Sequence, residues 1–142
     1  MKLRFIMLGR TRRAECRDLF EDYCRRLGRF AEVEVTELRE GSPASLKKLK
    51  LERGTTVLLD AAGRHFTSPQ FARWLADIRD RGGRELTFLC GDAEGFPEGA
   101  RDAAGASLSL SALTFPHEFA RVMLAEQVYR AFTILSGHPY SK

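Results

Sequence analysis

The sequence has few residues suited to disulfides or metal sites. Its three cysteines, Cys16, Cys24 and Cys90, include no C-x-x-C pair, and the chain has only three histidines. An odd number of cysteines without paired spacing predicts neither a disulfide framework nor a zinc site. Cys90 falls within an apolar run, so we interpret it as a small core residue. We therefore expect no bound metal ion.

Long hydrophobic runs are also missing. No stretch approaches the roughly 18 apolar residues that cross a membrane. The opening segment MKLRFIMLGR has too short an apolar run for a signal peptide and continues directly into charged sequence. These absences predict a cytoplasmic protein with no membrane partner.

The common signatures of nucleotide binding and hydrolysis are absent as well. The glycine-bearing segment 91–95 reads G-D-A-E-G, which matches neither G-x-x-x-x-G-K-[ST] nor G-x-G-x-x-G. None of His65, His117 and His138 lies in a recognisable local arrangement with a serine or cysteine nucleophile. No pair of carboxylates is convincingly spaced for hydrolytic chemistry. The individual residues therefore name no reaction.

What the chain does contain is typical of one globular domain. It has 142 residues, of which 44% are hydrophobic and 30% are charged, enough for a substantial core. We expect a single domain over residues 1–142. The net charge is +4 and the pI is near 9.2, and the first 30 residues hold nine basic and four acidic side chains. Arginines dominate there, which suits either phosphate contacts or a solvated helix face.

Predicted strands and helices alternate along the chain. Apolar or alternating runs predict strands, and helical spacing with capping residues predicts helices. The strands are expected at 2–8, 32–38, 55–60, 85–90 and 107–110. Five helices are expected: one that ends near residue 27, three that begin at 42–43, 68 and 97, and one that spans 117–136. This order is typical of an α/β domain with a mostly parallel sheet and helices on both faces. Ligands of such sheets bind at the carboxyl ends of strands, which here are 59–60, 91–95 and 111–116.

The predicted helix at 117–136 is apolar on two sides. Phe119, Val122 and Met123 belong to one stripe, and Leu124 and Val128 extend it well beyond a normal one-sided face. A helix apolar on two sides is buried on two sides, against a second subunit or within one chain. We favour a homodimer. The buried position also predicts a partner for the charge of Glu126.

The segments on either side of this helix differ in kind. The loop at 111–116, SALTFP, has small side chains and accessible main-chain groups. It suits either a ligand bound by main chain, such as an adenine edge or an amino-acid moiety, or a tight strand-to-helix connection. The last five residues, HPYSK, are expected to form a flexible polar tail.

These same residues resemble a known family. The blocks MKLRFIMLG, EDYCRRLGRF and SLSALTFPHEFARVMLAEQVYRA, followed by HPY, are similar to the ribosomal RNA large-subunit methyltransferase H family. This family belongs to the SPOUT class of knotted methyltransferases. The resemblance runs from end to end, and the block before HPY is its most specific part.

The resemblance implies an S-adenosylmethionine-dependent enzyme that methylates N3 of a pseudouridine in large-subunit (23S) ribosomal RNA. It also implies a C-terminal trefoil knot, which is a rare topology, and an obligate homodimer acting on ribosomal RNA or the whole ribosome. Carried over by position, the cofactor-binding residues are Leu59, Asp60, Gly91, Asp92, Ser111, Ala112, Leu113, Thr114, Phe115 and Pro116.

The remaining site residues follow from charge and from the tail. We expect His138 and Tyr140 to orient the base or relay its proton. The arginines and lysine expected to contact RNA are Arg4, Arg10, Arg12, Arg13, Arg121 and Lys142. The sequence departs from the family in two places: Asp92 stands where a second glycine is usual, and Ser141 and Lys142 replace a histidine and an arginine. The alternatives are a related methyltransferase for another RNA, or a non-catalytic RNA- or nucleotide-binding dimer.

Overall fold

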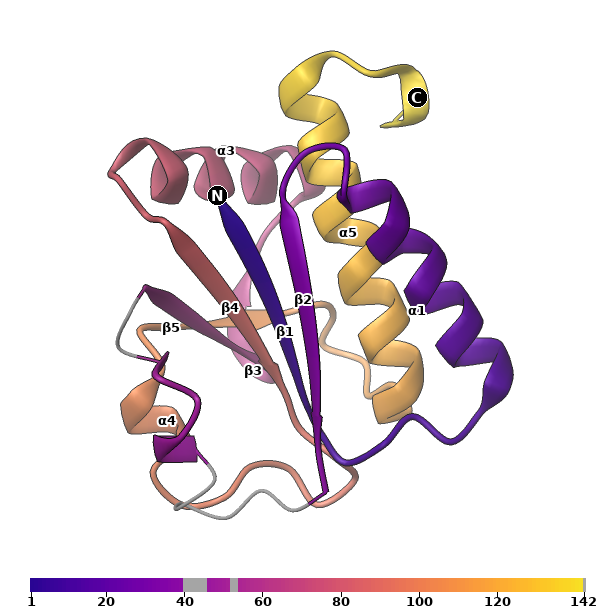
Figure 1. Cartoon of the computed structure of the whole chain (residues 1–142), viewed down its shortest axis with the longest axis vertical. Coiled ribbons are helices and arrows are strands. Elements are labelled where there is room, and N and C mark those ends of the chain that lie inside the picture. Colours follow the sequence, from indigo (N-terminus) through magenta and orange to yellow (C-terminus); the bar gives the residue numbers. More distant parts are fainter. Residues whose placement is uncertain (40–45, 52–53, 142) are drawn as a thin grey trace.

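The structure is a computed structural model that describes residues 1–39, 46–51 and 54–141. Its centre is a five-stranded sheet in the order β2-β1-β4-β3-β5, and every pairing between neighbouring strands is parallel. The strands are β1 (Lys2–Leu8), β2 (Glu32–Leu38), β3 (Thr55–His65), β4 (Glu85–Cys90) and β5 (Ala106–Ser109). The predicted α/β class with a parallel sheet is confirmed (Figure 1).

The helices lie on both faces of this sheet. They are α1 (Ala14–Leu27), α3 (Ser68–Asp80), the single-turn α4 (Ala100–Ala103) and α5 (His117–Ser136), followed by a short 3₁₀ turn at Pro139–Ser141. α5 packs against both α1 and α3 on one side of the sheet, and α4 lies on the other (Figure 1). None of the helices in the described ranges combines the length and apolar character needed to cross a membrane.

The continuous apolar run of β1 follows from burial on both faces. Successive side chains of a strand point to opposite faces of the sheet. Leu3, Phe5 and Met7 therefore join the core beneath the long helices, which includes the stacked ring of Phe88 from β4. Ile6 and Leu8 join a smaller core on the opposite face. That second core receives Leu46, Leu49 and Leu51 from the segment between β2 and β3, and Ala100 from α4.

Most predicted element boundaries are confirmed, including those of β1, β2, β4 and α5. Three differ. β3 does not end at Asp60 but continues to His65, with an irregularity that places both Leu59 and Arg64 opposite Leu108 of β5. The helix predicted from Pro97 begins only at Ala100. The strand predicted at 107–110 lies one residue earlier.

The helix predicted from 42–43 to about 52 lies partly outside the described residues. The single domain and the trefoil knot stay predictions.

Residues 138–140 are more ordered than a flexible polar tail. Gly137 ends α5 with a left-handed φ of 73°, and the chain then turns back. The Tyr140 ring packs edge-on against Tyr129, with centroids 4.6 Å apart. Its hydroxyl donates to Glu126 Oε1 at 3.1 Å. The prediction of a flexible tail is wrong for this segment, because Tyr140 finds apolar and polar partners on α5.

Candidate functional site

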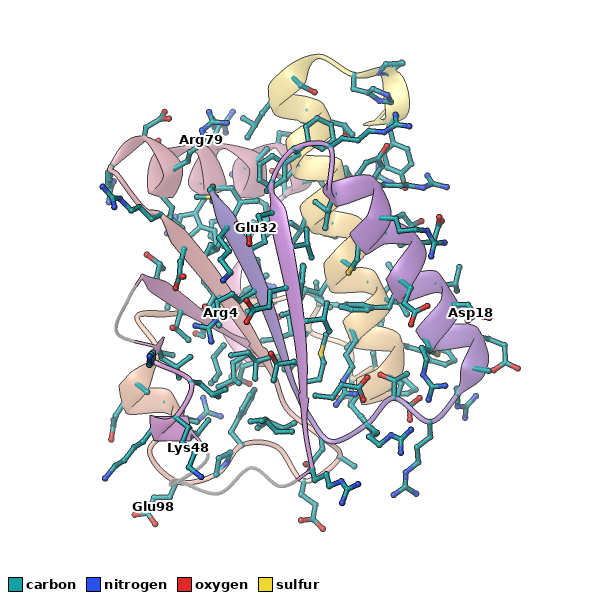
Figure 2. The ribbon with its side chains drawn as sticks, in the orientation of Figure 1. Arg4, Asp18, Glu32, Lys48, Arg79 and Glu98 are labelled. Carbon is teal, nitrogen blue, oxygen red and sulfur yellow. The ribbon has the colours of Figure 1, made fainter. Side chains whose placement is uncertain are left out.

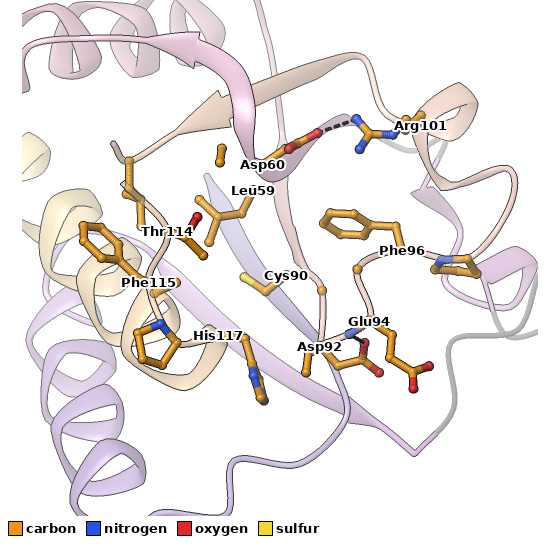
Figure 3. Close-up of a pocket in the computed structure, with 18 of the residues that line it drawn as sticks. Leu59, Asp60, Cys90, Asp92, Glu94, Phe96, Arg101, Thr114, Phe115 and His117 are labelled. Carbon is orange, nitrogen blue, oxygen red and sulfur yellow. Dashed lines mark hydrogen bonds and ion pairs between the residues drawn. The ribbon is translucent and has the colours of Figure 1, made fainter. Parts of the chain in front are cut away.

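A pocket of about 900 Å³ opens at the carboxyl ends of β4 and β5, beside residues 59–61 within β3. Its walls come from the three predicted segments and from the first turn of α5 (Figure 3). We call it the strand-end pocket. It brings together all the residues predicted to bind the cofactor except Ala112: Leu59, Asp60, Gly91, Asp92, Ser111, Leu113, Thr114, Phe115 and Pro116. Ala112 is exposed and lies outside the lining.

The turn after β4 is held closed by its own hydrogen bonds. The Glu94 amide donates to Asp92 Oδ1 at 2.8 Å, and the Gly95 amide donates to the Asp92 carbonyl at 3.0 Å. A Cβ on Gly91 would lie 2.7 Å from the Gly95 carbonyl oxygen, so no other residue fits there without moving backbone. Asp92, the departure from the family pattern, is thus accommodated as a side chain that stabilises the turn.

The opposite wall of the pocket carries an ion pair. Asp60 Oδ2 pairs with Arg101 Nη1, and Asp60 Oδ1 accepts from the Ala62 amide at 3.1 Å. Figure 3 shows this pair across the pocket from His117 and Asp92. The Ala62 hydrogen bond and the Arg101 guanidinium outweigh the effect of burial and hold the pKa of Asp60 below its usual value. Asp60 therefore presents a fixed negative charge at neutral pH.

This lowered pKa predicts a pH-dependent effect on stability. A carboxyl group whose pKa is lower in the folded state stabilises that state at pH values above its unfolded-state pKa, which is about 3.9 for aspartate. The stabilisation is lost as the pH falls through the lower folded-state pKa. We expect Asp60→Asn to be less stable than wild type near pH 7 and to approach wild type below pH 3. Urea unfolding at both pH values measures this, and an equal difference at both would contradict it.

The loop at 111–116 is shaped by its serines and delivers the chain to α5. Ser109 Oγ donates to the Ser111 carbonyl, and Ser111 Oγ accepts from the Leu113 amide, both at 3.0 Å. Together with Phe96 and Leu110, the side chain of Phe115 gives the pocket apolar walls. Apolar walls with a few polar groups are typical of small-molecule sites.

A second cleft of about 920 Å³ adjoins the strand-end pocket, at the carboxyl ends of β1 and β2. We call it the arginine cleft because Arg10, Arg12, Arg17 and Arg39 line it. The two hollows share four lining residues: Asp92, Ala93, Glu94 and His117. The turn after β4 and the start of α5 therefore form a common boundary between them.

A buried arginine on α5 binds the main chain at this boundary. Arg121 is 1% exposed. Its Nη2 donates to the carbonyls of Leu8 at 2.8 Å and Gly91 at 3.5 Å. Its Nη1 donates to the Gly9 carbonyl and to Thr11 Oγ1, both at 3.1 Å. The prediction that Arg121 contacts RNA is wrong here, because its guanidinium lies inside the protein and joins the ends of β1 and β4 to α5.

Arg4 requires the same correction. It is 9% exposed, and its Nη2 donates to the Leu49 carbonyl at 2.7 Å. It also lies 3.8 Å from a carboxylate oxygen of Glu34 and 3.9 Å from one of Glu85. Figure 2 shows Arg4 over the sheet, whereas Asp18 and Arg79 project outward from their helices. Its position on a strand buried on both faces explains why it is unavailable to RNA.

The other predicted RNA contacts have different positions. Arg10, Arg12 and Arg13 are exposed. Arg10 and Arg12 line the arginine cleft, whereas the Arg13 guanidinium lies 5.4 Å from the centroid of the Phe119 ring. Lys142 lies outside the described residues.

The loop that carries these arginines is anchored by Glu118. Its Oε1 accepts from the amides of Arg12 at 3.0 Å and Arg13 at 2.9 Å. Burial alone would raise the pKa of Glu118, but the Arg13 and Arg12 amides outweigh it and lower that pKa. Glu118 is thus a charged anchor between α5 and the start of α1.

The tail residues predicted to be catalytic do not reach either hollow within one chain. His138 and Tyr140 follow the C-terminal end of α5, whereas the pocket lies at its start (Figure 1). The Tyr140 hydroxyl is held at Glu126, nine residues or about 14 Å from the start of α5. Burial, a hydrogen bond with Tyr23 and the charge of Glu126 raise the pKa of Tyr140, so its hydroxyl stays protonated at neutral pH.

Glu126 has the charged partner that its position predicts. Arg130 Nη2 lies 2.6 Å from Glu126 Oε1, and Arg130 Nε donates to the same oxygen at 2.8 Å. The ion pair lies midway along α5, beside Tyr140. Arg130 is therefore engaged within the chain.

Sequence reasoning missed several residues of the two hollows. Phe96 and Arg101 lie beyond the predicted strand end, in a segment whose course depends on the opposite core. The sequence predicts that His117 begins a helix, but it does not predict that His117 lines both the strand-end pocket and the arginine cleft. Arg39 follows directly after the strand at 32–38, so the strand-end rule applied to that strand could have found it.

Comparison with known proteins gives a consistent match over the whole chain. The family model described as "Predicted SPOUT methyltransferase" matches residues 1–141. Three similar proteins are each named "Ribosomal RNA large subunit methyltransferase H". The one from Dinoroseobacter shibae is 41% identical over 155 residues, which cover 100% of this chain and 99% of the relative. That from Koribacter versatilis is 40% identical over 144 residues (99% and 97%), and that from Geobacter sp. strain M21 is 38% identical over 151 residues (99% and 98%).

Proposed function

The chain belongs to the SPOUT methyltransferase family, and from this premise we propose that it transfers the methyl group of S-adenosylmethionine to N3 of a pseudouridine in large-subunit ribosomal RNA. The names of the relatives supply the RNA class, and the sequence resemblance supplies the nucleotide and atom. One observation carries the proposal: a single pocket collects nearly all the residues that the resemblance assigns to the cofactor.

The pocket's chemistry fits this cofactor. Its volume, about 900 Å³, lies within the usual range for small-molecule sites. Phe96, Leu110 and Phe115 can pack against an adenine ring, and main-chain groups of the loop at 111–116 can pair with its edge. The Asp60 carboxylate can accept hydrogen bonds from ribose hydroxyls or from an ammonium group. When bound, S-adenosylmethionine supplies an electrophilic methyl group.

The protein's own part is then to bind, orient and exclude water. Aligning the base nitrogen with the methyl group removes most of the entropic cost of bringing two reactants together. The turn at 91–95 and the start of α5 lie between the pocket and the arginine cleft. Their polar side chains face the place where a base entering from the cleft would meet the cofactor.

A homodimer is part of this proposal. Much of the apolar surface of α5 is buried within one chain, since Leu124 and Val128 are fully buried. Phe119 and Met123, one turn apart, remain 45% and 44% exposed, and Leu113 in the loop before α5 is 72% exposed. A second subunit covering these side chains would remove apolar surface from water. Ribosomes as substrate also agree with the predicted cytoplasmic location, which stays a prediction.

The dimer gives the tail a testable role. If His138 and Tyr140 act on the base, a partner subunit must supply them. Neither residue lines the pocket of its own chain, and the Tyr140 hydroxyl is held at Glu126, about 14 Å along α5 from the start of that helix. We expect His138→Ala/Tyr140→Phe and Gly91→Ala each to transfer methyl groups at about a hundredth of the wild-type rate or less when assayed alone. Heterodimers formed by mixing them contain one intact pocket facing one intact tail, so mixing is expected to restore part of the methyl-transfer rate. Full activity of the tail variant alone would rule out the role.

The function itself is tested with labelled S-adenosylmethionine and ribosomes that lack the modification. Nuclease digestion and mass spectrometry locate the label, and calorimetry measures cofactor binding separately. We expect label on N3 of one pseudouridine in large-subunit RNA. Label on another nucleotide would correct the target, and label on another RNA would favour a related methyltransferase. Cofactor binding without any transfer would support the non-catalytic alternative.

A further inference from the structure

The arginine cleft is a built hollow and not merely a charged surface. It lies over the ends of β1 and β2, and the turn after β4 separates it from the strand-end pocket. Its arginines come from three places: the loop after β1, the first turns of α1 and the residue after β2. Residues distant in sequence thus converge on one cavity, which a helix face with scattered charges would not produce.

The cleft has two chemically different walls. The wall away from the pocket carries Arg10, Arg12, Arg17 and Arg39. The wall shared with the pocket carries Asp92, Glu94 and His117, and Glu118 lies beside it. Glu118 is occupied by the main-chain amides that it accepts, and Asp92 by the Glu94 amide. Within the part of the chain that the structure describes, no ion pair joins these carboxylates to the guanidinium groups of the basic wall; Glu118 instead lies 3.9 Å from His117.

The local structure also orients the basic wall. The Arg17 guanidinium donates to the Thr11 carbonyl, and the Thr11 amide donates to Glu37 Oε2 at 3.2 Å. Glu118 holds the main chain of Arg12 and Arg13. The loop that bears Arg10 and Arg12 is therefore attached to α1, β2 and α5, while both of those side chains remain exposed.

We propose that the arginine cleft is the subsite for the target nucleotide: its basic wall binds the RNA phosphates that flank that nucleotide, and its shared wall receives the base beside His117. Guanidinium groups match phosphate geometry through paired hydrogen bonds. A base with N–H donors finds acceptors on Asp92, Glu94 and His117. The inference rests on the proposed function, and it replaces the buried Arg4 and Arg121 with Arg17 and Arg39 as RNA contacts.

The test compares two double variants that remove the same charge. Arg10→Gln/Arg12→Gln alters the cleft, and Arg73→Gln/Arg79→Gln alters exposed positions on α3, at the other end of the sheet (Figure 1). Filter binding to ribosomes that lack the modification is measured from low to high salt, and calorimetry measures S-adenosylmethionine affinity. We expect the cleft variant to bind ribosomes at least about tenfold more weakly at low salt. Its salt slope should fall by about 1 for each phosphate that the protein no longer neutralises, with cofactor affinity unchanged.

The outcomes separate this inference from the proposed function, because ribosome binding is measured without methyl transfer. Equal weakening by the two double variants would show that only overall charge matters and would overturn the subsite. If the wild-type protein methylates RNA and the cleft variant binds ribosomes as tightly as wild type, the subsite is overturned as well. A wild-type protein that binds through the cleft but transfers no methyl group would remove the proposed activity and leave the subsite standing. For His117→Ala, we expect a lower kcat with little change in ribosome affinity.

Discussion

Replacing Arg121 with methionine is expected to lower the free energy of unfolding by about 3 kcal/mol or more, because several buried acceptors lose their donor and each costs about 1–3 kcal/mol when left unsatisfied. Methionine keeps much of the volume but donates no hydrogen bonds. The carbonyls of Leu8, Gly9 and Gly91 and the Thr11 hydroxyl would then be left without these donors. Buried acceptors left unsatisfied are expensive, and the decrease is a large share of a typical domain's stability.

Chemical denaturation of wild type and Arg121→Met measures this effect. The matched control is Arg79→Met on α3, whose side chain is 46% exposed and pairs with an exposed Asp80, so a change near zero is expected there. Arg121→Lys tests the geometry, since a single ammonium cannot reach acceptors on both sides as a planar guanidinium does. A decrease of less than about 1 kcal/mol in Arg121→Met, below the usual cost of an unsatisfied buried group, would show that water or a neighbouring group replaces the guanidinium.

Gly91→Ala is expected to reduce methyl transfer by about a hundredfold, the scale of effect of a displacement near 1 Å in a catalytic site. The added Cβ would lie 2.7 Å from the Gly95 carbonyl oxygen and 3.1 Å from its carbon. Both are backbone atoms, so the turn at 91–95 must open. Opening moves the Asp92 and Glu94 side chains, which line both hollows, and we expect cofactor affinity to fall together with the rate.

Gly105→Ala is the matched control. A Cβ there would meet only the Thr56 carbonyl oxygen, at 3.9 Å, an ordinary van der Waals distance. It is expected to bind cofactor and transfer methyl groups like wild type. Calorimetry and single-turnover rates on both variants make the comparison, with circular dichroism to check folding. Wild-type cofactor affinity in Gly91→Ala would remove the turn from the binding site.

The elements that sequence patterns located well are those with strong local signals. β1 and β4 are continuous apolar runs, and α5 ends at a glycine with left-handed φ. The extension of β3 past Asp60 could not be found in this way, because residues 61–65, AAGRH, form neither a continuous apolar run nor an alternation of polar and apolar side chains. Gly63 allows it: a Cβ there would lie 2.8 Å from the Leu108 amide nitrogen. Pairing with β5 therefore decides the length of β3, and pairing is not a local property.

The candidate site divides in a similar way. Pocket positions after β4 and β5 could be predicted because the carboxyl ends of parallel strands meet at one edge and because the resemblance is specific there. Leu59 and Asp60 lie within β3, and for them only the resemblance gives the correct position. The RNA contacts were chosen from charge, and charge does not report burial. Arg4 and Arg121 look like any other arginine in the sequence, yet their guanidinium groups are bonded inside the protein. The tail predicts a role at the site for Tyr140, yet its own chain holds this residue against Glu126 on α5, outside the lining of both hollows.

The order of the strands in the sheet also governs how the chain can acquire its structure during synthesis. β1, made first, lies between β2 and β4, and α1 packs against α5, the last helix made. Contacts that join distant parts of a chain slow folding. The N-terminal third must wait for more than half of the polypeptide to emerge before β1 gains its second neighbour. Completion of the core, including the Arg121 contacts, needs α5, so truncation within that helix is expected to leave an aggregation-prone chain rather than a smaller folded one.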